Sequence, residues 1–280
     1  MGKNLDVILV GNPGTGKSTI AASLTNSSNF QSGVSFGGGH SKELNSYYDQ
    51  NADIRYSDTP GLADVELAKI AAAAIEKAIQ STASKKRKLK LIFVITQEAG
   101  RVRPADLYTI DKITQAIQLT HGPVRNNGYS IIVNKFPKKI YESKDFQENG
   151  KEKFLEPFKK TGNHLRISTN NIHFNFKMSE LDYKDNAKMQ GKALEDIRGF
   201  ILKYSGTLTG VKSCLPIQTG NLAKKLEEYK ESVSEKFGGP KPNPGSKQST
   251  AQTSNYTQKN YNTNFQSPGN NYGRQTNNNN

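Results

Sequence analysis

Nine residues near the start of the chain have the types and spacing of a phosphate-binding loop. They read Gly-Asn-Pro-Gly-Thr-Gly-Lys-Ser-Thr, directly after an apolar run at 5–10, and match the pattern G-x-x-x-x-G-K-[ST]. Glycines let backbone N–H groups approach a phosphate, and the positive N-terminal end of a following helix attracts it further. In this pattern the lysine reaches the β- and γ-phosphates, and the adjacent hydroxyl ligates Mg²⁺. The nucleotide-binding residues that the motif predicts are Gly11, Asn12, Pro13, Gly14, Thr15, Gly16, Lys17, Ser18 and Thr19.

A second motif, Asp58-Thr59-Pro60-Gly61, follows the apolar run at 54–57. An aspartate at the end of a strand can hold Mg²⁺ through a water molecule, opposite Ser18. Gly61 offers an N–H group that can approach a γ-phosphate. D-x-x-G after a strand, at this distance beyond a phosphate loop, is the arrangement of GTPases, and an ordinary Pro-Gly turn is the alternative interpretation.

The segment 32–41 between these motifs contains three consecutive glycines. A switch loop needs such mobility, together with one hydroxyl that closes on Mg²⁺ when the γ-phosphate is present. We expect Ser41 to be that nucleotide and metal ligand, with Ser35 as the second choice. The metal ligands predicted from all three segments are Ser18, Ser41 and Asp58.

Alternating apolar and amphipathic stretches along residues 5–205 provide the elements that must position these motifs. Strands are predicted at 5–10, 54–57, 89–96, 129–134 and 172–176. Helices are predicted at 17–25, 64–81, 105–119, 151–160 and 188–203. Strands that alternate with helices of this length give a mostly parallel sheet covered on both faces. We therefore predict an α/β fold, the three-layer architecture of P-loop NTPases, over residues 1–205.

Beyond this domain the sequence predicts a helical extension at 206–237 and a disordered tail at 238–280. Leu222, Leu226, Tyr229 and Val233 recur at helical spacing within 219–237. Such a helix either binds a partner or lies back on the domain. The tail is rich in Asn, Gln, Ser, Thr and Gly, so it has too few apolar residues to offset the entropy of ordering.

The composition of the chain limits its partners and its compartment. Its 280 residues carry a formal net charge of +14, which is compatible with nucleic acid as a partner but does not favour it, because the charge is spread. The basic clusters, including 85–88 with Lys90, are expected to be solvated. A single cysteine, Cys214, fits a reducing compartment, so we expect a cytoplasmic protein. No apolar run reaches the length of a membrane span.

Four stretches resemble the septin-related GTPases known as the avirulence-induced-gene type, immune-associated nucleotide-binding or GIMAP family. They are Gly11–Thr19, Ser32–Ser41, Asp58–Leu62 and Gln97–Asp106. In that family the last stretch carries Gly-Arg followed by an aromatic residue and threonine, where this chain has Val102 and Arg103. The resemblance covers about residues 5–204 and implies dimers that meet across the nucleotide face. It also implies that Arg101, or else Arg103, acts as a catalytic residue supplied across that dimer.

The base-recognition motif of GTPases is incomplete in this sequence. Asn134 and Lys135 stand where an Asn-Lys pair is expected, and both are predicted to bind the nucleotide. The following aspartate, which accepts two hydrogen bonds from guanine, is replaced by Pro137. Since proline has neither a carboxylate nor an N–H group, guanine preference is expected to fall about 10- to 100-fold unless another residue compensates.

These observations together predict a switch that binds GTP or GDP with Mg²⁺ and hydrolyses GTP slowly, with dimerisation accelerating the reaction. Lys17 and Arg101 are the expected catalytic residues. Leu62 stands where many GTPases place the glutamine that orients water. Four alternatives remain open: a nucleotide-dependent scaffold with negligible hydrolysis, a P-loop ATPase, a small-substrate kinase, and a nucleic-acid-binding protein, which the positive charge and the Asn- and Tyr-containing tail suggest.

Overall fold

The computed structural model divides the chain into two units, residues 1–239 and 240–280, and all described residues lie in the first. The described ranges are 3–30, 43–62, 68–98, 100–124, 127–161, 165–178 and 187–217, with residues 224, 227, 228 and 231. The predicted loop at 32–41, including Ser35 and Ser41, therefore lies outside the described residues. The predicted tail at 238–280 lies outside them as well.

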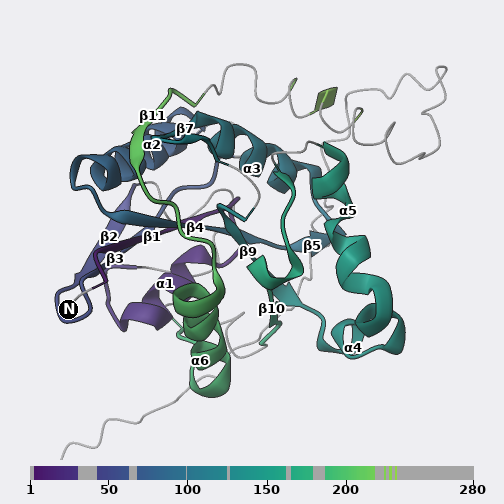
Figure 1. Cartoon of the computed structure of the whole chain (residues 1–280). Helices are drawn as coiled ribbons and strands as arrows, with labels where there is room; N and C mark the ends of the chain where they lie inside the picture. Colours follow the sequence, from purple (N-terminus) through teal and green to yellow (C-terminus); the bar gives the residue numbers. More distant parts are fainter. Residues whose placement is uncertain are drawn as a thin grey trace, which may run out of the picture. The chain divides into compact units, whose positions relative to one another are not determined.

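A six-stranded sheet forms the centre of the first unit, in the order β10-β9-β4-β1-β3-β2 (Figure 1). Its strands are β1 (Leu5–Val10), β2 (Asn45–Asp49), β3 (Ile54–Asp58), β4 (Lys88–Ile95), β9 (Ser130–Phe136) and β10 (Ile172–Phe176). All neighbouring pairs are parallel except β2 with β3. The inner strands are almost continuously buried, which is typical of parallel strands covered on both faces. The predicted three-layer α/β fold is confirmed.

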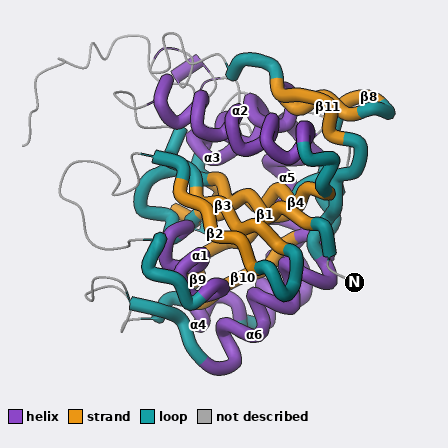
Figure 2. Tube along the Cα trace, turned by 90° about the vertical axis from the view of Figure 1, so that its left-hand side faces the viewer, coloured by secondary structure: helices purple, strands orange, loops and turns teal. Residues whose placement is uncertain are grey.

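Helices cover both faces of this sheet (Figures 1 and 2). One face packs against α2 (Ala68–Ser84), α3 (Pro104–Ala116) and α5 (Lys151–Thr161). The other packs against α1 (Lys17–Thr25), α6 (Gly191–Gly199) and the π-helical turn Phe200–Tyr204. Alternate residues of β4 supply the two layers, since Leu91 and Phe93 belong to the first apolar cluster and Ile92 and Val94 to the second.

Smaller elements fill the connections between these layers. A hairpin of β5 (Gln97–Glu98) and β6 (Arg101–Val102) joins β4 to α3. The connection from β9 to β10 contains α4 (Lys138–Tyr141), the π-helical turn Phe146–Gly150, α5 and the 3-10 turn Thr169–Asn171.

A second sheet has the order β11-β7-β8, with β7 (Ile117–Leu119), β8 (Gly122–Pro123) and β11 (Val211–Cys214). Residues 117–119, predicted as the end of a helix, instead form β7, and the helix ends at Ala116. Residues 211–214, expected in a helical extension, form β11 and pair with β7.

Packing continues past the expected domain end at residue 205. Leu208 forms a bridge with Leu89 of β4, and Val211, Cys214 and Ile217 join the apolar cluster around α2. Of the helix predicted at 219–237, only four exposed helical positions are described: Lys224, Glu227, Glu228 and Glu231. Its apolar positions lie outside the described residues.

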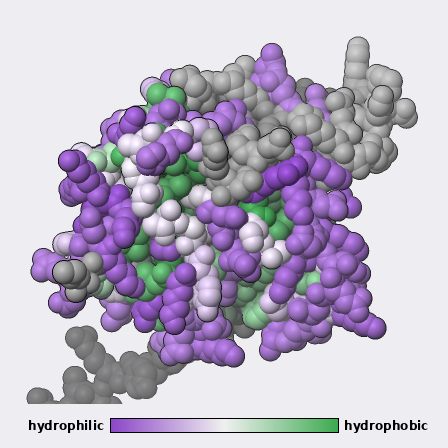
Figure 3. Space-filling view, viewed as in Figure 1, coloured by the Kyte–Doolittle hydropathy of each residue, from purple (hydrophilic) through white to green (hydrophobic). Residues whose placement is uncertain are grey.

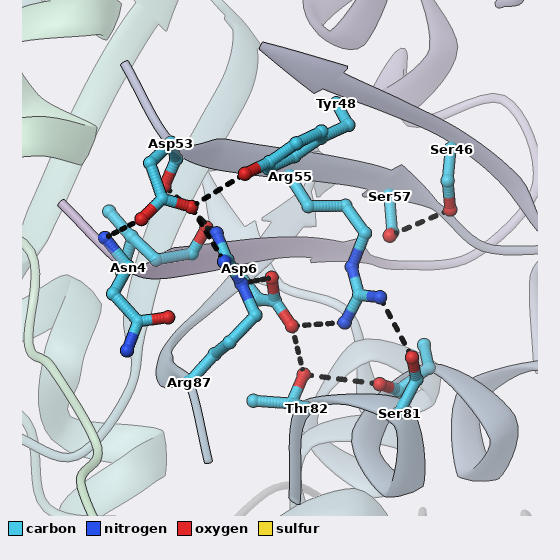
Figure 4. Close-up of polar contacts among 12 residues, drawn as sticks. Asn4, Asp6, Ser46, Tyr48, Asp53, Arg55, Ser57, Ser81, Thr82 and Arg87 are labelled. Atoms are coloured by element: carbon cyan, nitrogen blue, oxygen red, sulfur yellow. Dashed lines mark hydrogen bonds and ion pairs between the residues drawn. The ribbon is translucent and has the colours of Figure 1, made fainter. Parts of the chain in front are cut away.

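An ion cluster closes the amino-terminal edge of the central sheet (Figure 4). The buried carboxylate of Asp6 on β1 accepts hydrogen bonds from Arg55 of β3, from Thr82 of α2 at 2.6 Å and from Arg87 at 2.7 Å. Arg87 also donates to Asp53 at 2.6 Å. The expectation that the basic cluster at 85–88 is solvated is therefore wrong for Arg87, whose guanidinium is engaged by these two carboxylates.

No helix among the described residues is long and apolar enough to cross a membrane. The face drawn in Figure 3 is dominated by hydrophilic side chains, with apolar ones visible between them. The apolar residues of the sheet and helices are instead gathered in the two clusters on either side of the sheet.

Candidate functional site

The predicted site residues that the structure describes gather at the carboxyl edge of the central sheet. The phosphate loop begins at Gly11, directly after β1, and Asp58 is the last residue of β3. Asn134 lies on β9, two residues before that strand ends. Because β1, β3, β4 and β9 are parallel, their carboxyl ends share one edge of the sheet, which is where ligands bind in folds of this class.

The phosphate loop has a backbone that only glycine accommodates at its last turn. Gly16 has φ of 90° and is the N-cap of α1, which begins at Lys17 as predicted. A Cβ at Gly16 would also collide with the side-chain amide of Asn134, and one at Gly11 with the carbonyl of Val94. The loop thus packs closely against Val94 of β4 and Asn134 of β9, and it ends at the N-terminus of α1.

Lys17 is buried within this loop. Its Nζ donates to the carbonyl oxygen of Asn12 at 3.3 Å. Burial lowers the pKa of Lys17, while the carboxylates of Asp58 and Asp106 act in the opposite direction. The ammonium group of Lys17 therefore lies near the carboxylates of Asp58 and Asp106 and is bonded to the loop backbone at Asn12.

Ser18 and Asp58 meet directly across the two motifs. Ser18 Oγ donates to Asp58 Oδ2 at 2.6 Å, which joins the start of α1 to the end of β3. A hydroxyl and a carboxylate are oxygen donors of the kind that Mg²⁺ accepts alongside phosphate oxygens. The donor set thus fits the predicted metal, although Ser41, the third predicted ligand, lies outside the described residues.

The segment after Asp58 lies against the phosphate loop. The hydroxyl of Thr59 donates to the carbonyl of Leu9 at 2.9 Å, and a Cβ at Gly61 would collide with the ring of Pro13. Leu62 is buried in the apolar cluster with only 1% of its surface exposed. The side chain at this position therefore packs in the core and does not face the phosphate loop.

Asn134 is held against the phosphate loop by a hydrogen bond to the backbone. Its Nδ2 donates to the carbonyl of Thr15 at 2.8 Å, and its Oδ1 accepts from Asn175 Nδ2 of β10 at 2.6 Å. Lys135 is exposed and has φ of 57°, and Pro137 is the N-cap of α4. The structure therefore brings Asn134 to the loop and leaves the side chain of Lys135 at the surface beside it.

Two side chains of α3 contact the loop although the sequence did not predict them as site residues. Asn12 Nδ2 donates to Asp106 Oδ1 at 2.6 Å, and Thr109 Oγ1 donates to Asn12 Oδ1 at 3.1 Å. Asp106 ends the stretch 97–106 that carried the family resemblance, which was the only available signal. Asn175, the partner of Asn134, had no recognisable motif.

The two candidate arginines have different environments. Arg101 lies on β6 and its side chain is exposed. Arg103 makes two hydrogen bonds to Asp106, from Nε at 2.8 Å and from Nη2 at 3.0 Å. Arg103 is therefore engaged within its own chain, and Arg101 is the arginine of this pair that faces solvent.

Comparison with known proteins adds one family match. Residues 6–135 match the sequence profile of the family described as 50S ribosome-binding GTPase. Comparison with curated protein sequences gave no match. The profile covers all described motifs of the site up to Lys135.

Similar solved structures include two of Era and one of NFeoB. Era in complex with MgGDPNP and nucleotides 1506–1542 of 16S ribosomal RNA is 20% identical, with a TM-score of 0.44, over 73% of this chain and 58% of that one. An Aquifex aeolicus Era variant bound to GDP and AlF4⁻ is 20% identical, with a TM-score of 0.43, over 72% and 57%. An S. thermophilus NFeoB variant bound to GMPPNP is 13% identical, with a TM-score of 0.39, over 84% and 92%. This chain thus spans less than two thirds of the Era chains that it matches.

The sheet order and the phosphate loop show the P-loop NTPase fold, and the profile match over residues 6–135 supports a GTPase domain of this class. The finer resemblance to the immune-associated, septin-related family has no support in these matches. The dimer and the catalytic role of Arg101 that this resemblance implies therefore stay predictions.

Proposed function

We propose that this chain, with its P-loop GTPase domain, is a switch that binds GTP and GDP with Mg²⁺ and hydrolyses GTP slowly. The observation that carries the proposal is the contact of Ser18 with Asp58 at 2.6 Å, beside the buried Lys17. This contact joins the two motifs that a GTPase uses to hold a nucleotide and to sense its last phosphate. The chain is proposed to act in a reducing compartment, the cytoplasm, since Cys214 is its single cysteine.

Each group of the site has a role in this proposal. Backbone N–H groups of the loop and the N-terminus of α1 hold the phosphates, and Lys17 neutralises the β- and γ-phosphates. Ser18, Asp58 and Ser41 would hold Mg²⁺, which supplies positive charge against the phosphate oxygens. Gly61, adjacent to the phosphate loop at Pro13, would offer its N–H group to the γ-phosphate.

Slow hydrolysis follows from the position of Leu62. Its side chain is buried in the core and cannot orient an attacking water molecule. Turnover of an unassisted GTPase is slow, on the order of 10⁻⁴ to 10⁻³ s⁻¹, even where a glutamine is present. An arginine supplied by a second copy would raise the rate by about 10³-fold or more. The exposed Arg101 is the group that we assign to this role.

GTP is the proposed nucleotide despite the altered base motif. The hydrogen bond from Asn134 to the loop supports its assignment to the base site, whereas Pro137 offers no carboxylate to guanine. Loose specificity or use of ATP is the second candidate, and the replacement of aspartate by Pro137 is the observation that favours it. A scaffold with negligible hydrolysis is favoured by Leu62 and disfavoured by Arg101.

Calorimetric titration of the full chain with GTP, GDP and ATP, each with and without Mg²⁺, tests the binding part of this proposal. We expect GTP and GDP to bind more tightly than ATP, and Mg²⁺ to strengthen GTP binding. Lys17→Ala is expected to abolish binding, since it removes the cation that contacts the phosphates. The exposed Lys139→Ala on α4 serves as the matched control and should bind like the unmodified chain.

Three outcomes would count against the proposal. If purified chain with Mg²⁺ binds no nucleoside triphosphate, the nucleotide site is absent. If Lys17→Ala retains near-normal affinity, the phosphate loop has been assigned to the wrong residues. Tighter binding of ATP than of GTP would replace the guanine switch by the ATPase alternative.

A further inference from the structure

A chain of hydrogen bonds connects the β5–β6 hairpin to the phosphate loop, and the function proposed above does not use it. Asn12, at the second position of the loop, has both ends of its side-chain amide bonded to α3. Its Nδ2 donates to Asp106 at 2.6 Å and its Oδ1 accepts from Thr109 at 3.1 Å. All three side chains are buried, with 3%, 1% and 1% of their surface exposed, respectively. The orientation of this amide is therefore fixed by α3.

The carboxylate of Asp106 accepts hydrogen bonds from Arg103 as well as from Asn12. Arg103, the residue directly after β6, binds both carboxylate oxygens of Asp106 through Nε at 2.8 Å and Nη2 at 3.0 Å. Burial raises the pKa of Asp106, while the bonds from Arg103 and Asn12 act in the opposite direction. A buried carboxylate of this kind is stable only while it keeps its charged partner.

The backbone carbonyl of Asn12 in turn bonds two other residues of the loop. Its carbonyl oxygen accepts from Thr15 Oγ1 at 2.9 Å and from Lys17 Nζ at 3.3 Å. A shift of Asn12 therefore moves an acceptor that positions Lys17. The path from the hairpin runs through Arg103, Asp106 and Asn12 to Lys17, which is proposed to contact the phosphates.

We propose that Asp106 is a positioning residue for the phosphate loop, and that Arg103, Asp106 and Asn12 couple the β5–β6 hairpin to nucleotide affinity. This inference rests on the proposed function, because it requires the loop to bind a nucleotide. The coupling is reciprocal: a partner that displaces the hairpin, such as a second copy engaged through Arg101, changes the affinity for nucleotide, and nucleotide changes the affinity for that partner.

Asp106→Asn in the full chain tests the positioning role. Asparagine keeps the shape and one acceptor oxygen but loses the charge that holds Arg103. Since hydrogen bonds to charged groups are the strong ones, we expect the Kd of GDP and of GTP with Mg²⁺ to rise by the same factor, about tenfold. Asp111→Asn is the matched control, because Asp111 lies on the same helix and its carboxylate accepts a hydrogen bond from Gln115. It is expected to bind nucleotide like the unmodified chain.

A double variant separates positioning from a general loss of structure. If Asp106 acts through Asn12, then Asp106→Asn in an Asn12→Ala background adds less than about twofold to the Kd, because the contact is already absent. Purely structural damage would instead add its full factor in both backgrounds, which would overturn the inference. Unfolding midpoints of all variants report whether each one folds.

Thr109→Val provides the measurement if Asp106→Asn does not fold. It removes the donor to Asn12 Oδ1 and keeps the shape of the side chain, and we expect a rise of about threefold in Kd. Unchanged affinity in the folded variants, with normal binding by the unmodified chain, overturns this inference alone. Absence of binding by the unmodified chain overturns the proposed function and this inference together.

Discussion

The buried lysines Lys17 and Lys90 have different electrostatic environments, because one lies near carboxylates and the other is bonded to neutral oxygens. Lys17 lies near the carboxylates of Asp58 and Asp106, which favour its charged form. Lys90, on β4, donates to the carbonyl of Ser205 at 2.6 Å and to its hydroxyl at 2.9 Å, and both acceptors are neutral. The expectation that Lys90 is solvated is wrong, since only 5% of it is exposed. Burial, with a smaller effect of Lys3, lowers the pKa of Lys90 to about 8.

The depressed pKa of Lys90 predicts a rise of stability with pH. Below pH 8 the lysine is protonated in both the folded and the unfolded chain, so the cost of burying its charge is complete. Between about pH 8 and its ordinary pKa of 10.5, the unfolded chain binds more protons, so the free energy of unfolding increases with pH. Denaturant titrations at pH 7, 8 and 9 should show this increase in the unmodified chain relative to Lys90→Met.

The comparison with Lys90→Met also removes the contribution of Cys214. Burial raises the pKa of that thiol to about 12, which lowers stability as pH increases above about 9. Because Cys214 is present in both chains, its effect cancels in the difference. An identical pH dependence in the two chains would contradict the prediction.

At the level of single residues, the sequence predicted the site residues that lie within one contiguous motif, and it did not predict contacts between distant residues. The phosphate loop is a contiguous motif, so its residues are recognisable without a structure. The contact between Asn12 and Asp106 joins residues that lie 94 positions apart. No property of either side chain indicates the other, because an aspartate near the start of a helix is ordinarily a solvated, dipole-stabilising residue.

Among the elements, the amino-terminal edge of the sheet depends on one buried carboxylate. Asp6 of β1 binds Arg55 of β3, Thr82 of α2 and Arg87, which lies just before β4 (Figure 4). These bonds fix the relative positions of the three strands and the helix at the end opposite the nucleotide site. The cluster thus supports the register of the sheet without contacting the loop.

Asp6→Asn is expected to destabilise the chain while leaving the nucleotide site intact. Asparagine cannot neutralise Arg55 and Arg87, and removal of one partner of a buried ion pair costs about 3–5 kcal/mol. Denaturant unfolding should show a loss of this size. Asp49→Asn on the edge strand β2, where the carboxylate accepts one backbone N–H, is the control and should cost about 1 kcal/mol or less. A loss below about 1 kcal/mol for Asp6→Asn would show that the cluster contributes little.

Elements with strong periodicity were predicted, and short, half-exposed ones were not. The strands at 5–10 and 172–176 and the helix at 17–25 have the predicted bounds, because their apolar patterns begin and end sharply. Strand β2, Asn-Ser-Tyr-Tyr-Asp, is half-exposed and polar, so no apolar run marks it. Strands β7 and β11 form by pairing with each other, and that long-range contact overrides the helical pattern of 105–119.

On the scale of the whole molecule, the proposed acceleration of hydrolysis requires a dimer, because the catalytic arginine would come from a second copy of the chain. Arg101 is the exposed residue of β6, directly beyond the turn at Gly100, whereas Arg103 forms an ion pair with Asp106. The exposed arginine is thus available to a neighbour. The sequence suggested both residues, and only their different hydrogen bonding separates them.

Hydrolysis that depends on a second copy must depend on protein concentration. We expect the turnover per molecule to rise with concentration until dimers are saturated. Arg101→Ala should then lower turnover at saturating concentration by about 10³-fold or more, since it removes the charge proposed to face the transferred phosphate. Phosphate release across a dilution series measures both effects. The exposed Arg166→Ala is the control, and constant turnover across the dilution series would exclude a dimer-supplied arginine.

The order of the strands also constrains how the protein is made. Strand β1 pairs with β3 and β4, and the loop after it is completed by Asn134, far along the chain. A ribosome that adds roughly 5–20 residues per second needs about 7–27 s to reach that asparagine. Throughout this interval the nascent chain has its glycine-rich segment but no finished cradle. If the proposed nucleotide site needs Asn134, we expect GTP to stabilise the chain only after the fifth strand of the central sheet has emerged.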